Sequence, residues 1–500
     1  MKWKVLLILV AVLSTFVFAV EYPTTVKILL STELSSWGSS KGYAFEKVDI
    51  KSARPFVITS DNFEKSFTNG EIILTPDGDK IHVKVKDFER TLGAEVVLTP
   101  KNSKTKFMLQ NAKRKLGAPI YPGELIIKNI GGKLYVINEV SIEEYVKRVV
   151  PSEMPASFPK EALKAQAVAA RSIAVLSAMN PKDKFLSYGA DVDDSILSQV
   201  YNNVEFTSVI EDAVDETKGT VMFYEGKLVD QLNYFSTSSG FTANVEEVWS
   251  YKDKFPGKPV PFLKSQPQFE NLKVPAEFAN DMGMPDIQRE DVARWFFKMW
   301  KIPEGTIFYD AQSPWFRWKV TLTQEQLQNI VSKTLPQRER ADKVLNADFI
   351  QVKSGMKPDD PNFSTGKIYD LHVIKRGHGG NVMILEIVAE NGTWWIYKEY
   401  NIRFVIRPRK DFAKSEEDIV LRLYNGSTWN NYSILPSAFF TMDIERDSQG
   451  NLIKVTFWGG GNGHGVGMSQ YGAKFMGNNG YSYKDILKRY YYGVEIKAVY

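Results

Sequence analysis

The sequence predicts an α+β protein: a β-rich core around a central Ala-rich helix, an N-terminal β region and an inserted α/β middle segment. Three observations support this fold class. Short runs of β-branched and aromatic residues recur along the chain, one strongly helical segment covers residues 160–179, and glycine or proline turns separate the runs. No internal repeat is visible, which argues against a solenoid.

Composition sets the scale of the molecule. Of the 500 residues, 43% are hydrophobic, so the chain can bury a large core in two to four domains or in one domain with insertions. The formal net charge of +4 is low for a nucleic-acid-binding protein. The chain has no cysteine, which excludes disulfides and thiolate metal sites.

Residues 1–19 have the layout of a secretory signal peptide. Lys2 and Lys4 precede an apolar run, Val5 to Phe18, and Val17 and Ala19 are small residues before a cut after Ala19. The alternative is an uncleaved membrane anchor, but the run is short for the roughly 20 residues that span a bilayer. We therefore expect an exported protein of the periplasm, cell envelope or medium, which meets a membrane only through this segment if it is uncleaved.

Residues 20–117 are expected to form the β-rich N-terminal region. Strands are predicted at 26–30, 55–58 and 81–85, and residues 76–79 have the composition of a turn. We interpret this region as a packing or spacer module without chemistry of its own.

Residues 118–254 are expected to form the first part of the core. Strands at 124–127 and 133–137 come before the Ala-rich helix of residues 160–179. Pro159 suits the start of that helix because its missing N–H has no partner there, and Asn180-Pro181 ends it. Since alanine lets neighbouring backbone approach closely, we expect the helix to be buried at the centre.

The inserted middle segment is expected at residues 255–415. Its predicted elements are two helices and two strand regions, at 289–300, 324–335, 368–388 and 393–406. Residues 416–500 are then expected to complete the core. They contain a strand at 453–458, a glycine-rich loop at 459–467, a short helix at 469–476 and a helix that starts at the Ser482 capping box.

The first candidate site is the segment Pro151-Ser152-Glu153-Met154-Pro155. Because prolines restrict the backbone, we expect Glu153 to lie on a rigid loop just before the Ala-rich helix. A carboxyl group near Met154 and Phe158 would have a raised pKa, which suits a general acid near neutral pH. The alternative interpretation is an acid that interacts favourably with a helix N-terminus.

Two further segments offer groups that could contact a sugar. Residues 463–473 flank a histidine with glycines, and residues 234–242 place hydroxyls between aromatic side chains. Either segment could equally be a structural turn or strand end; nucleotide-loop spacing and a Gly-x-Ser-x-Gly elbow are both missing. The candidate contacts are Tyr234, Ser236, Ser238, Ser239, Gly240, His464, Ser469, Gln470 and Tyr471.

A metal site is not expected from this sequence. The four histidines form no His-x-x-x-His pair, and cysteine ligands are missing. We therefore predict neither a metal nor a cofactor.

The motifs together resemble one known family. Residues 151–172 closely resemble the signature of the SpoIID/LytB family, and residues 234–249, 435–440, 463–473 and 486–494 agree in the same order. The resemblance implies a peptidoglycan lytic transglycosylase with Glu153 as the catalytic residue at a groove beside the Ala-rich helix. Some members resemble amidase enhancers, which implies a non-catalytic alternative. Certain members hold zinc partly through cysteines, which residues 189–194 lack.

The resemblance also implies a mechanism and partners. Glu153 would protonate the bond between N-acetylmuramic acid and N-acetylglucosamine and then take the proton of the muramyl C6 hydroxyl, leaving a 1,6-anhydro sugar. Arg171 would either orient Glu153 or form a structural salt bridge. The expected partners are peptidoglycan glycan strands and possibly a cell-wall amidase, but no nucleic acid. The rival functions are an amidase enhancer and a cell-wall glycan-binding protein.

Overall fold

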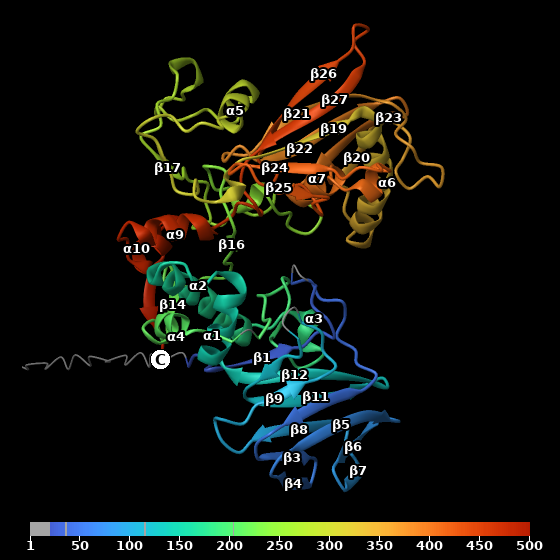
Figure 1. Ribbon diagram of the computed structural model, residues 1–500, viewed down its shortest axis with the longest axis vertical. Coiled ribbons are helices and arrows are strands. Elements are labelled where there is room, and N and C mark those ends of the chain that lie inside the picture. The colour runs from blue at the N-terminus through green and yellow to red at the C-terminus, as the bar shows by residue number, and fades with distance from the viewer. Residues whose placement is uncertain (1–20, 36–37, 115–116, 204) are drawn as a thin grey trace, which may run out of the picture.

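The computed structural model describes residues 21–35, 38–114, 117–203 and 205–500. The predicted signal segment therefore lies outside the described residues. Within them, no helix combines the length and the apolar character that a membrane span needs. The predicted α+β fold class is confirmed, with β-sheets at both ends of the molecule and helices between them (Figure 1).

Two sheets form the N-terminal region, antiparallel except for the parallel pair β1–β13, and their strands alternate buried and more exposed side chains as half-buried strands do. Contacts of β12 with β5 and of β11 with β6 bring the two sheets together over one core. The seven-stranded sheet has the order β13-β1-β12-β11-β8-β3-β4, and the six-stranded sheet has the order β10-β9-β2-β5-β6-β7. The strands are β1 (Thr25–Leu29), β2 (Val48–Ser52), β3 (Phe56–Ser60), β4 (Phe63–Phe67), β5 (Gly70–Asp77), β6 (Lys80–Val85), β7 (Phe88–Leu92), β8 (Glu95–Pro100), β9 (Phe107–Leu109), β10 (Ile120–Tyr121), β11 (Glu124–Ile130), β12 (Lys133–Ser141) and β13 (Val192–Asp193).

The expected boundary at residue 117 runs through this first sheet. Strands β11 and β12 follow that boundary, yet β12 pairs with β1 and β11 pairs with β8. The N-terminal strands and the strands that lead into the Ala-rich helix are therefore parts of one sheet, continuous through backbone hydrogen bonds.

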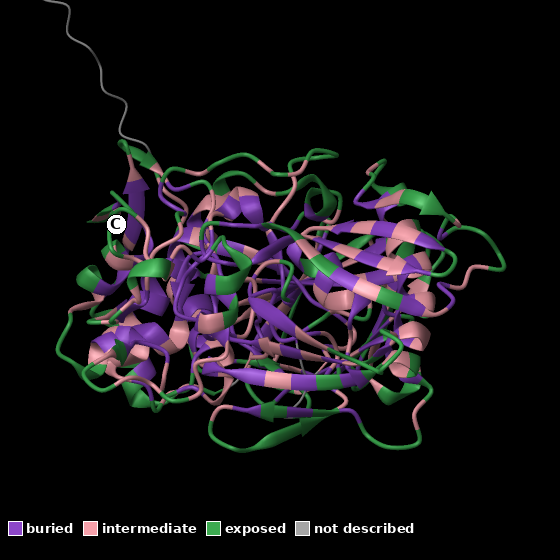
Figure 2. Ribbon diagram, turned by 90° about the horizontal axis from the view of Figure 1, so that it is seen from above, coloured by how far each residue is buried: buried purple, intermediate pink, exposed green. Residues whose placement is uncertain are grey.

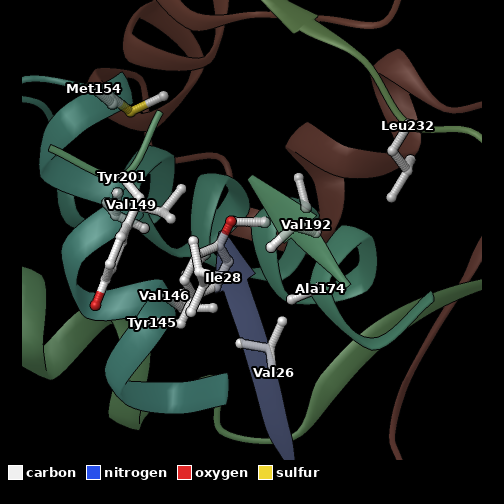
Figure 3. Packing of buried hydrophobic residues seen from close by; sticks show 14 of the residues in the cluster. Val26, Ile28, Tyr145, Val146, Val149, Met154, Ala174, Val192, Tyr201 and Leu232 are labelled. Carbon is white, nitrogen blue, oxygen red and sulfur yellow. The ribbon is translucent and has the colours of Figure 1, made fainter. Parts of the chain in front are cut away.

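The Ala-rich helix is confirmed as α2 (Lys160–Met179), and it is central. Six of its alanines are completely buried, and α2 contacts helices on several sides as well as strand β14. Buried residues fill the interior of the molecule, and exposed residues lie mostly around its edges (Figure 2). Its side-chain neighbours include residues of β1, α1 and β13 (Figure 3). The elements around it are α1 (Ile142–Glu153), α3 (Asp183–Leu186), α4 (Ser208–Asp215), β14 (Thr220–Tyr224), β15 (Lys227–Leu228), α9 (Gln470–Asn478), α10 (Tyr483–Tyr490) and β29 (Glu495–Ala498).

A second hydrophobic core lies in the middle of the chain, between Trp318 and Phe457. Strand β19 pairs with β27, so this body ends near residue 459 and not at the expected residue 415. Its two sheets have the orders β25-β24-β19-β27-β26 and β20-β23-β22-β21. Its elements are β19 (Trp318–Thr323), α6 (Gln324–Val344), β20 (Ile350–Gly355), β21 (Ile368–Arg376), β22 (Val382–Ala389), β23 (Gly392–Tyr397), α7 (Glu399–Val405), α8 (Lys410–Ala413), β24 (Val420–Leu423), β25 (Thr428–Asn430), β26 (Phe440–Arg446) and β27 (Leu452–Gly459).

Two predictions for this body need correction. The strand expected over residues 393–406 ends at Tyr397, and α7 follows it, because Lys398 has φ +77° and breaks the extended conformation. The buried residues Ile402, Val405 and Ile406 have helical spacing. The region expected at 368–388 is a hairpin of two strands, since residues 377–381 turn between β21 and β22.

Mostly short elements connect the two cores. They include α5 (Glu290–Phe297), which confirms the helix predicted near 289–300. Strand β16 pairs in parallel with β28, which brings residues 234–235 beside residues 468–469. The other connecting elements are β16 (Tyr234–Phe235), η1 (Val245–Glu247), β17 (Phe269–Glu270), η2 (Ala276–Phe278), β18 (Ile307–Phe308), η3 (Pro314–Phe316) and β28 (Met468–Ser469).

Candidate active site

Glu153 is the last residue of α1 and does not lie on the loop that the two prolines predicted. The helix continues through Pro151, and the Met154 N–H donates to the Val150 carbonyl at 2.8 Å to close its last turn. The Ser152 hydroxyl donates to the Arg148 carbonyl at 2.9 Å. The carboxyl group therefore lies at the negative end of a helix dipole, where the charged form is disfavoured.

The carboxyl group of Glu153 is held by the segment after β13. The Val200 N–H donates to Oε1 of Glu153 at 2.8 Å. Burial raises the pKa of Glu153 to about 7, although the Val200 N–H and the Tyr234 hydroxyl act in the opposite direction. The residue is half-buried and forms no ion pair with any residue that the structure describes. A carboxyl group with this pKa can both give and accept a proton near neutral pH.

A buried polar network lies behind this carboxyl group. The Tyr234 hydroxyl donates to Oε1 of Gln199 at 3.2 Å. The Gln199 amide donates to the Ala170 carbonyl at 3.2 Å and reaches the Tyr145 hydroxyl at 3.4 Å. Gln166 is fully buried beside Tyr234. Burial raises the pKa of the Tyr234 hydroxyl, and the Gln166 side chain acts in the opposite direction. The network fixes the Tyr234 ring next to Glu153.

The glycine-rich motif reaches the same place from the other end of the chain. The Gln470 side-chain amide donates to the Glu153 carbonyl at 3.0 Å, and the Tyr471 N–H donates to the Ser236 carbonyl at 3.1 Å. Gly467 has φ +75°, and a Cβ there would lie 2.0 Å from the Asn233 carbonyl, so only glycine fits. The structure thus brings together Glu153, Tyr234, Ser236 and Gln470, which the sequence placed far apart.

An aromatic wall continues from this point. The Tyr471 ring packs edge-on against Phe158 with centroids 5.4 Å apart, and the Lys474 ammonium lies 5.1 Å from the Phe158 ring. His464 packs against Trp249 at 4.8 Å and Phe235 at 5.6 Å. Phe158 and Phe235 are buried, whereas Tyr471, His464 and Trp249 are half-buried and can offer ring faces to a sugar.

His464 is uncharged at neutral pH. Burial lowers its pKa to about 3, and the positive charge of Arg403 acts in the same direction. Its Nδ1 atom lies 3.1 Å from the Val466 N–H and accepts that hydrogen bond, so the proton is on Nε2. The ring can therefore offer a stacking face, but it is not a general acid near neutral pH.

Four expected sugar contacts are buried inside the protein instead. Ser238, Ser239 and Ser469 are at most 1% exposed, and the Ser469 hydroxyl caps α9 by accepting from the Gly472 N–H. A Cβ at Gly240 would lie 2.7 Å from the Phe296 ring. At these positions the hydroxyl-rich segment is packed inside the protein, in a region called the joint below. Only Tyr234 and Ser236 of the segment are half-buried.

The joint is organised by Asp310, which the sequence analysis did not single out. Its carboxylate accepts from the Ser238 N–H and the Ser238 hydroxyl, both at 2.8 Å, and from the Ser469 hydroxyl. Burial raises the pKa of Asp310 to about 6. No sequence motif surrounds this aspartate, so only the folded structure connects it with the two hydroxyl-rich segments.

Arg171 forms the structural salt bridge, the second of its two expected roles. Its guanidinium makes two hydrogen bonds to Glu143, at 2.8 and 2.6 Å, and also reaches the carbonyls of Val214 and Thr220. Arg171 has no exposed surface. It connects α2 with α1, α4 and β14, and its charge is paired with Glu143, so it is not a substrate contact.

The metal question can be put to the described residues directly. Among them, no group of three or more His, Cys, Asp or Glu side chains is placed to hold a metal ion.

The chain was compared with known protein families. Residues 131–224 match the family model SpoIID, described as stage II sporulation protein. Over this segment the chain is similar to the SpoIID family. The SpoIID segment contains α1, α2 and β14, so it includes Glu153 and Arg171 together with most of the network behind the carboxyl group.

Named relatives extend the similarity beyond the SpoIID segment. The chain is 29% identical over 356 residues to an amidase enhancer of Bacillus subtilis, which covers 71% of this chain and 40% of that protein. It is 27% identical over 373 residues to stage II sporulation protein D of the same organism, covering 72% of this chain and 75% of the relative. The Bacillus amyloliquefaciens protein of that name is also 27% identical, over 377 residues. The chain thus spans less than half of the amidase enhancer.

Proposed function

We propose that this protein is an exported peptidoglycan lytic transglycosylase that cleaves glycan strands with Glu153 as its single general acid and base. The supporting observation is one half-buried carboxyl group with a pKa of about 7, placed beside Tyr234, Gln470 and an aromatic wall. The relatives named amidase enhancer and stage II sporulation protein D favour a role at the cell wall.

A single carboxyl group is sufficient for this reaction. Protonated Glu153 gives its proton to the glycosidic oxygen, and the bond from that oxygen to muramyl C1 breaks. The C6 hydroxyl oxygen of the same sugar forms the new bond to C1, and the Glu153 carboxylate takes the hydroxyl proton. The products are a 1,6-anhydro end and a free 4-hydroxyl, with Glu153 protonated again, so no water is consumed.

The surroundings of Glu153 suit this cycle better than hydrolysis. Glycoside hydrolysis generally uses two carboxyl groups, with the second as nucleophile or base. Among the described residues, the groups that shift the pKa of Glu153 include no second carboxyl group; besides burial, these are the Val200 amide and the Tyr234 phenol. The Val200 N–H donates to the carboxylate that exists midway through the cycle, and the neighbouring Tyr234 hydroxyl also favours this charged form.

The sugar contacts are proposed from residues that remain half-buried around Glu153. Tyr471 and His464 offer ring faces, and Tyr234, Ser236 and Gln470 offer hydrogen-bonding groups. Ring faces pack against the apolar side of a pyranose, while the polar groups bind its hydroxyls and acetamido groups. The substrate in this proposal is a glycan strand, and no cofactor takes part.

The decisive experiment uses the Glu153→Gln variant with purified glycan strands, both with and without stem peptides. Wild-type protein should release fragments with 1,6-anhydromuramyl ends, identified by mass. The variant should lose at least 100-fold in rate, because glutamine keeps the shape but cannot transfer the proton. Glu304→Gln, an exposed substitution of the same chemistry, is the matched control and should retain full activity.

Two results would reject the proposal. One is anhydro product from Glu153→Gln at the wild-type rate. The other is hydrolytic, reducing ends from the wild type, since these require a water nucleophile that the single-carboxyl mechanism does not use.

The second candidate function is an amidase enhancer, favoured by the relative of that name. This function predicts no glycan cleavage by the protein alone, but faster release of stem peptides when a cell-wall amidase is added. Measuring both products in one incubation separates the two functions, and Glu153→Gln should then leave the enhancement unchanged.

A further inference from the structure

We infer that the N-terminal β region is part of the active site, because the buried Arg114–Asp194 ion pair fixes the segment 192–201 that holds Glu153. The contacts that fix the segment do not depend on the proposed function, but their effect on glycan cleavage rests on it. It replaces the interpretation of residues 20–117 as a spacer. Arg114 and Asp194 act through Val200 and are therefore positioning residues.

The segment 192–201 begins as an edge strand of the N-terminal sheet. Strand β13 pairs in parallel with β1, with Val192 opposite Ile28 and Asp193 opposite Leu29. The Lys27 N–H donates to the Asp191 carboxylate at 2.8 Å, and the Asp194 N–H donates to the Leu29 carbonyl at 3.2 Å. Figure 3 shows Val26 and Ile28 of β1 among the same cluster of side chains as Val192.

The Arg114–Asp194 ion pair is the strongest anchor of the segment. Both side chains are at most 1% exposed, and the Arg114 guanidinium also donates to the Ser31 carbonyl at 2.9 Å. Asp194 accepts from the Ser31 N–H at 3.0 Å and from the Ser31 hydroxyl. A buried charge pair of this kind tolerates little displacement, because moving one partner leaves the other unpaired in a dry environment.

Three more contacts between the N-terminal region and the segment 192–201 anchor it as far as Val200. The Tyr43 hydroxyl donates to Asp193 at 2.8 Å, and the Ile196 N–H donates to the Gly38 carbonyl at 3.0 Å. Gly38 packs so closely on the Val200 side chain that a Cβ there would lie 2.6 Å away. The N-terminal region thus contacts this segment from its first residue to the one that donates to Glu153.

A hydrogen bond within the segment connects the residue after Val200 with Asp194 of the ion pair. The Tyr201 N–H donates to the Asp194 carbonyl at 3.1 Å, so Val200 is adjacent to a residue tied directly to the ion pair. The Tyr201 ring packs against Tyr121 of β10 and Tyr145 of α1, with centroids 5.9 and 5.2 Å away. Displacing the ion pair would therefore displace Val200 and admit water to Glu153.

The expected effect has a sign that can be measured. Burial, the largest influence, holds the pKa of Glu153 near 7, and the titratable groups that face it are Tyr145 on α1 and Tyr234 on β16. Loss of the Val200 hydrogen bond alone would raise this pKa. Entry of water outweighs that loss and lowers the pKa towards its ordinary value, by roughly one unit.

The experiment titrates Glu153 directly by ¹³C NMR of the full chain labelled at glutamate side chains, with its resonance identified by its disappearance in Glu153→Gln. The double variant Arg114→Met/Asp194→Leu removes the ion pair without leaving a charge unpaired. It should fold, titrate Glu153 about one unit below wild type, and lose roughly tenfold in cleavage rate at neutral pH. Ser31→Ala and Tyr43→Phe remove single anchors and should shift the pKa in the same direction by less.

The matched control is Ile72→Val on β5, which is buried in the same N-terminal core but in the other sheet, where its strand pairs with β2 and β6. It should lower the melting temperature and leave the Glu153 titration unchanged. An unchanged titration in the folded double variant would overturn the inference, as would an equal shift in Ile72→Val. If the double variant does not fold, unchanged titrations in Ser31→Ala and Tyr43→Phe overturn it. Because NMR titration needs no substrate, a shift without glycan cleavage in wild type would reject the proposed function alone.

Discussion

At the scale of single residues, the raised pKa of Glu153 comes from its position in the fold more than from neighbouring charges. Glu153 ends a helix and lies among buried groups; its carboxylate accepts a hydrogen bond from the neutral Val200 N–H and lies beside the neutral Tyr234 hydroxyl. An ion pair with a lysine or arginine would have lowered the pKa and kept the proton off at neutral pH. The site is therefore suited to a carboxyl group that alternates between both protonation states.

The raised pKa of Glu153 predicts a pH dependence of stability. A folded-state pKa of about 7 exceeds the ordinary value of 4.5, so the folded protein binds the extra proton between these pH values. Stability contributed by this group is therefore present below pH 4.5 and is lost as the pH rises to 7. Glu153→Gln has no such loss and should gain up to about 3 kcal/mol relative to wild type between pH 5 and pH 8.

Urea unfolding at both pH values measures this gain, with Glu304→Gln as the control for general charge effects. Equal stability differences at pH 5 and pH 8 would show that the Glu153 carboxyl group titrates normally in the folded protein.

At the scale of elements, α1 and α2 are joined by the buried pair of Glu143 and Arg171. Glu143→Gln leaves the Arg171 charge without its partner, so it should destabilise the protein by about 3–5 kcal/mol. The double variant Arg171→Met/Glu143→Leu should recover part of that loss. Thermal unfolding gives the values, and Glu89→Gln, from a pair that is half-exposed, should change them by less than about 1 kcal/mol.

The Asp310 joint gives a second prediction at this scale. Asn at position 310 would direct an amide N–H₂ towards the Ser238 and Ser469 donors, so Asp310→Asn should cost about 1–3 kcal/mol. The exposed substitution Asp281→Asn is the control. An unchanged melting temperature for Asp310→Asn would mean that the joint does not depend on this carboxylate.

The elements also show where sequence reasoning succeeds. Periodicity and composition identified α2 and five of the thirteen strands of the two N-terminal sheets, β1, β3, β6, β11 and β12, because local propensity and burial act together there. Sequence reasoning failed at Pro151, because a proline late in a helix costs little stability when tertiary contacts hold the last turn. It also failed at residues 399–405, where one positive φ angle at Lys398 starts a helix that apolar content alone did not distinguish from a strand.

The site was predictable only in part for a related reason. Glu153, Tyr234 and Gln470 belong to motifs that can be read from the sequence, and the structure brings them together. Val200, Gln199 and Asp310 lie in segments of ordinary composition. Their roles depend on which backbone N–H or carboxylate faces the site, and no local pattern encodes that. Ser238, Ser239 and Ser469 were misjudged because a hydroxyl binds buried protein groups as readily as it binds sugars.

At the scale of the whole molecule, two hydrophobic cores are built from separate stretches of the chain. The second core contains only residues from Trp318 to Phe457, whereas the first combines residues on both sides of it. Leu385→Ala, in the second core, should cost about 2–5 kcal/mol and speed amide hydrogen exchange in β22 and β23 while α2 remains protected. Leu163→Ala on α2 should produce the converse pattern.

Global exchange at one rate in both cores, for either leucine variant, would contradict this prediction by showing a single cooperative unit. Wild-type exchange at matched pH and temperature is the reference.

The hydrogen bond from Gln470 to the carbonyl of Glu153 spans 317 positions of the chain. Ribosomes deliver Glu153 and α2 long before they deliver β28, α9 and the strand β29 that pairs with β14. A nascent chain consequently carries its reactive carboxyl group in an incomplete setting until translation has passed residue 470. Under the proposed function, completion this late keeps glycan cleavage silent until the C-terminal segment has been synthesised.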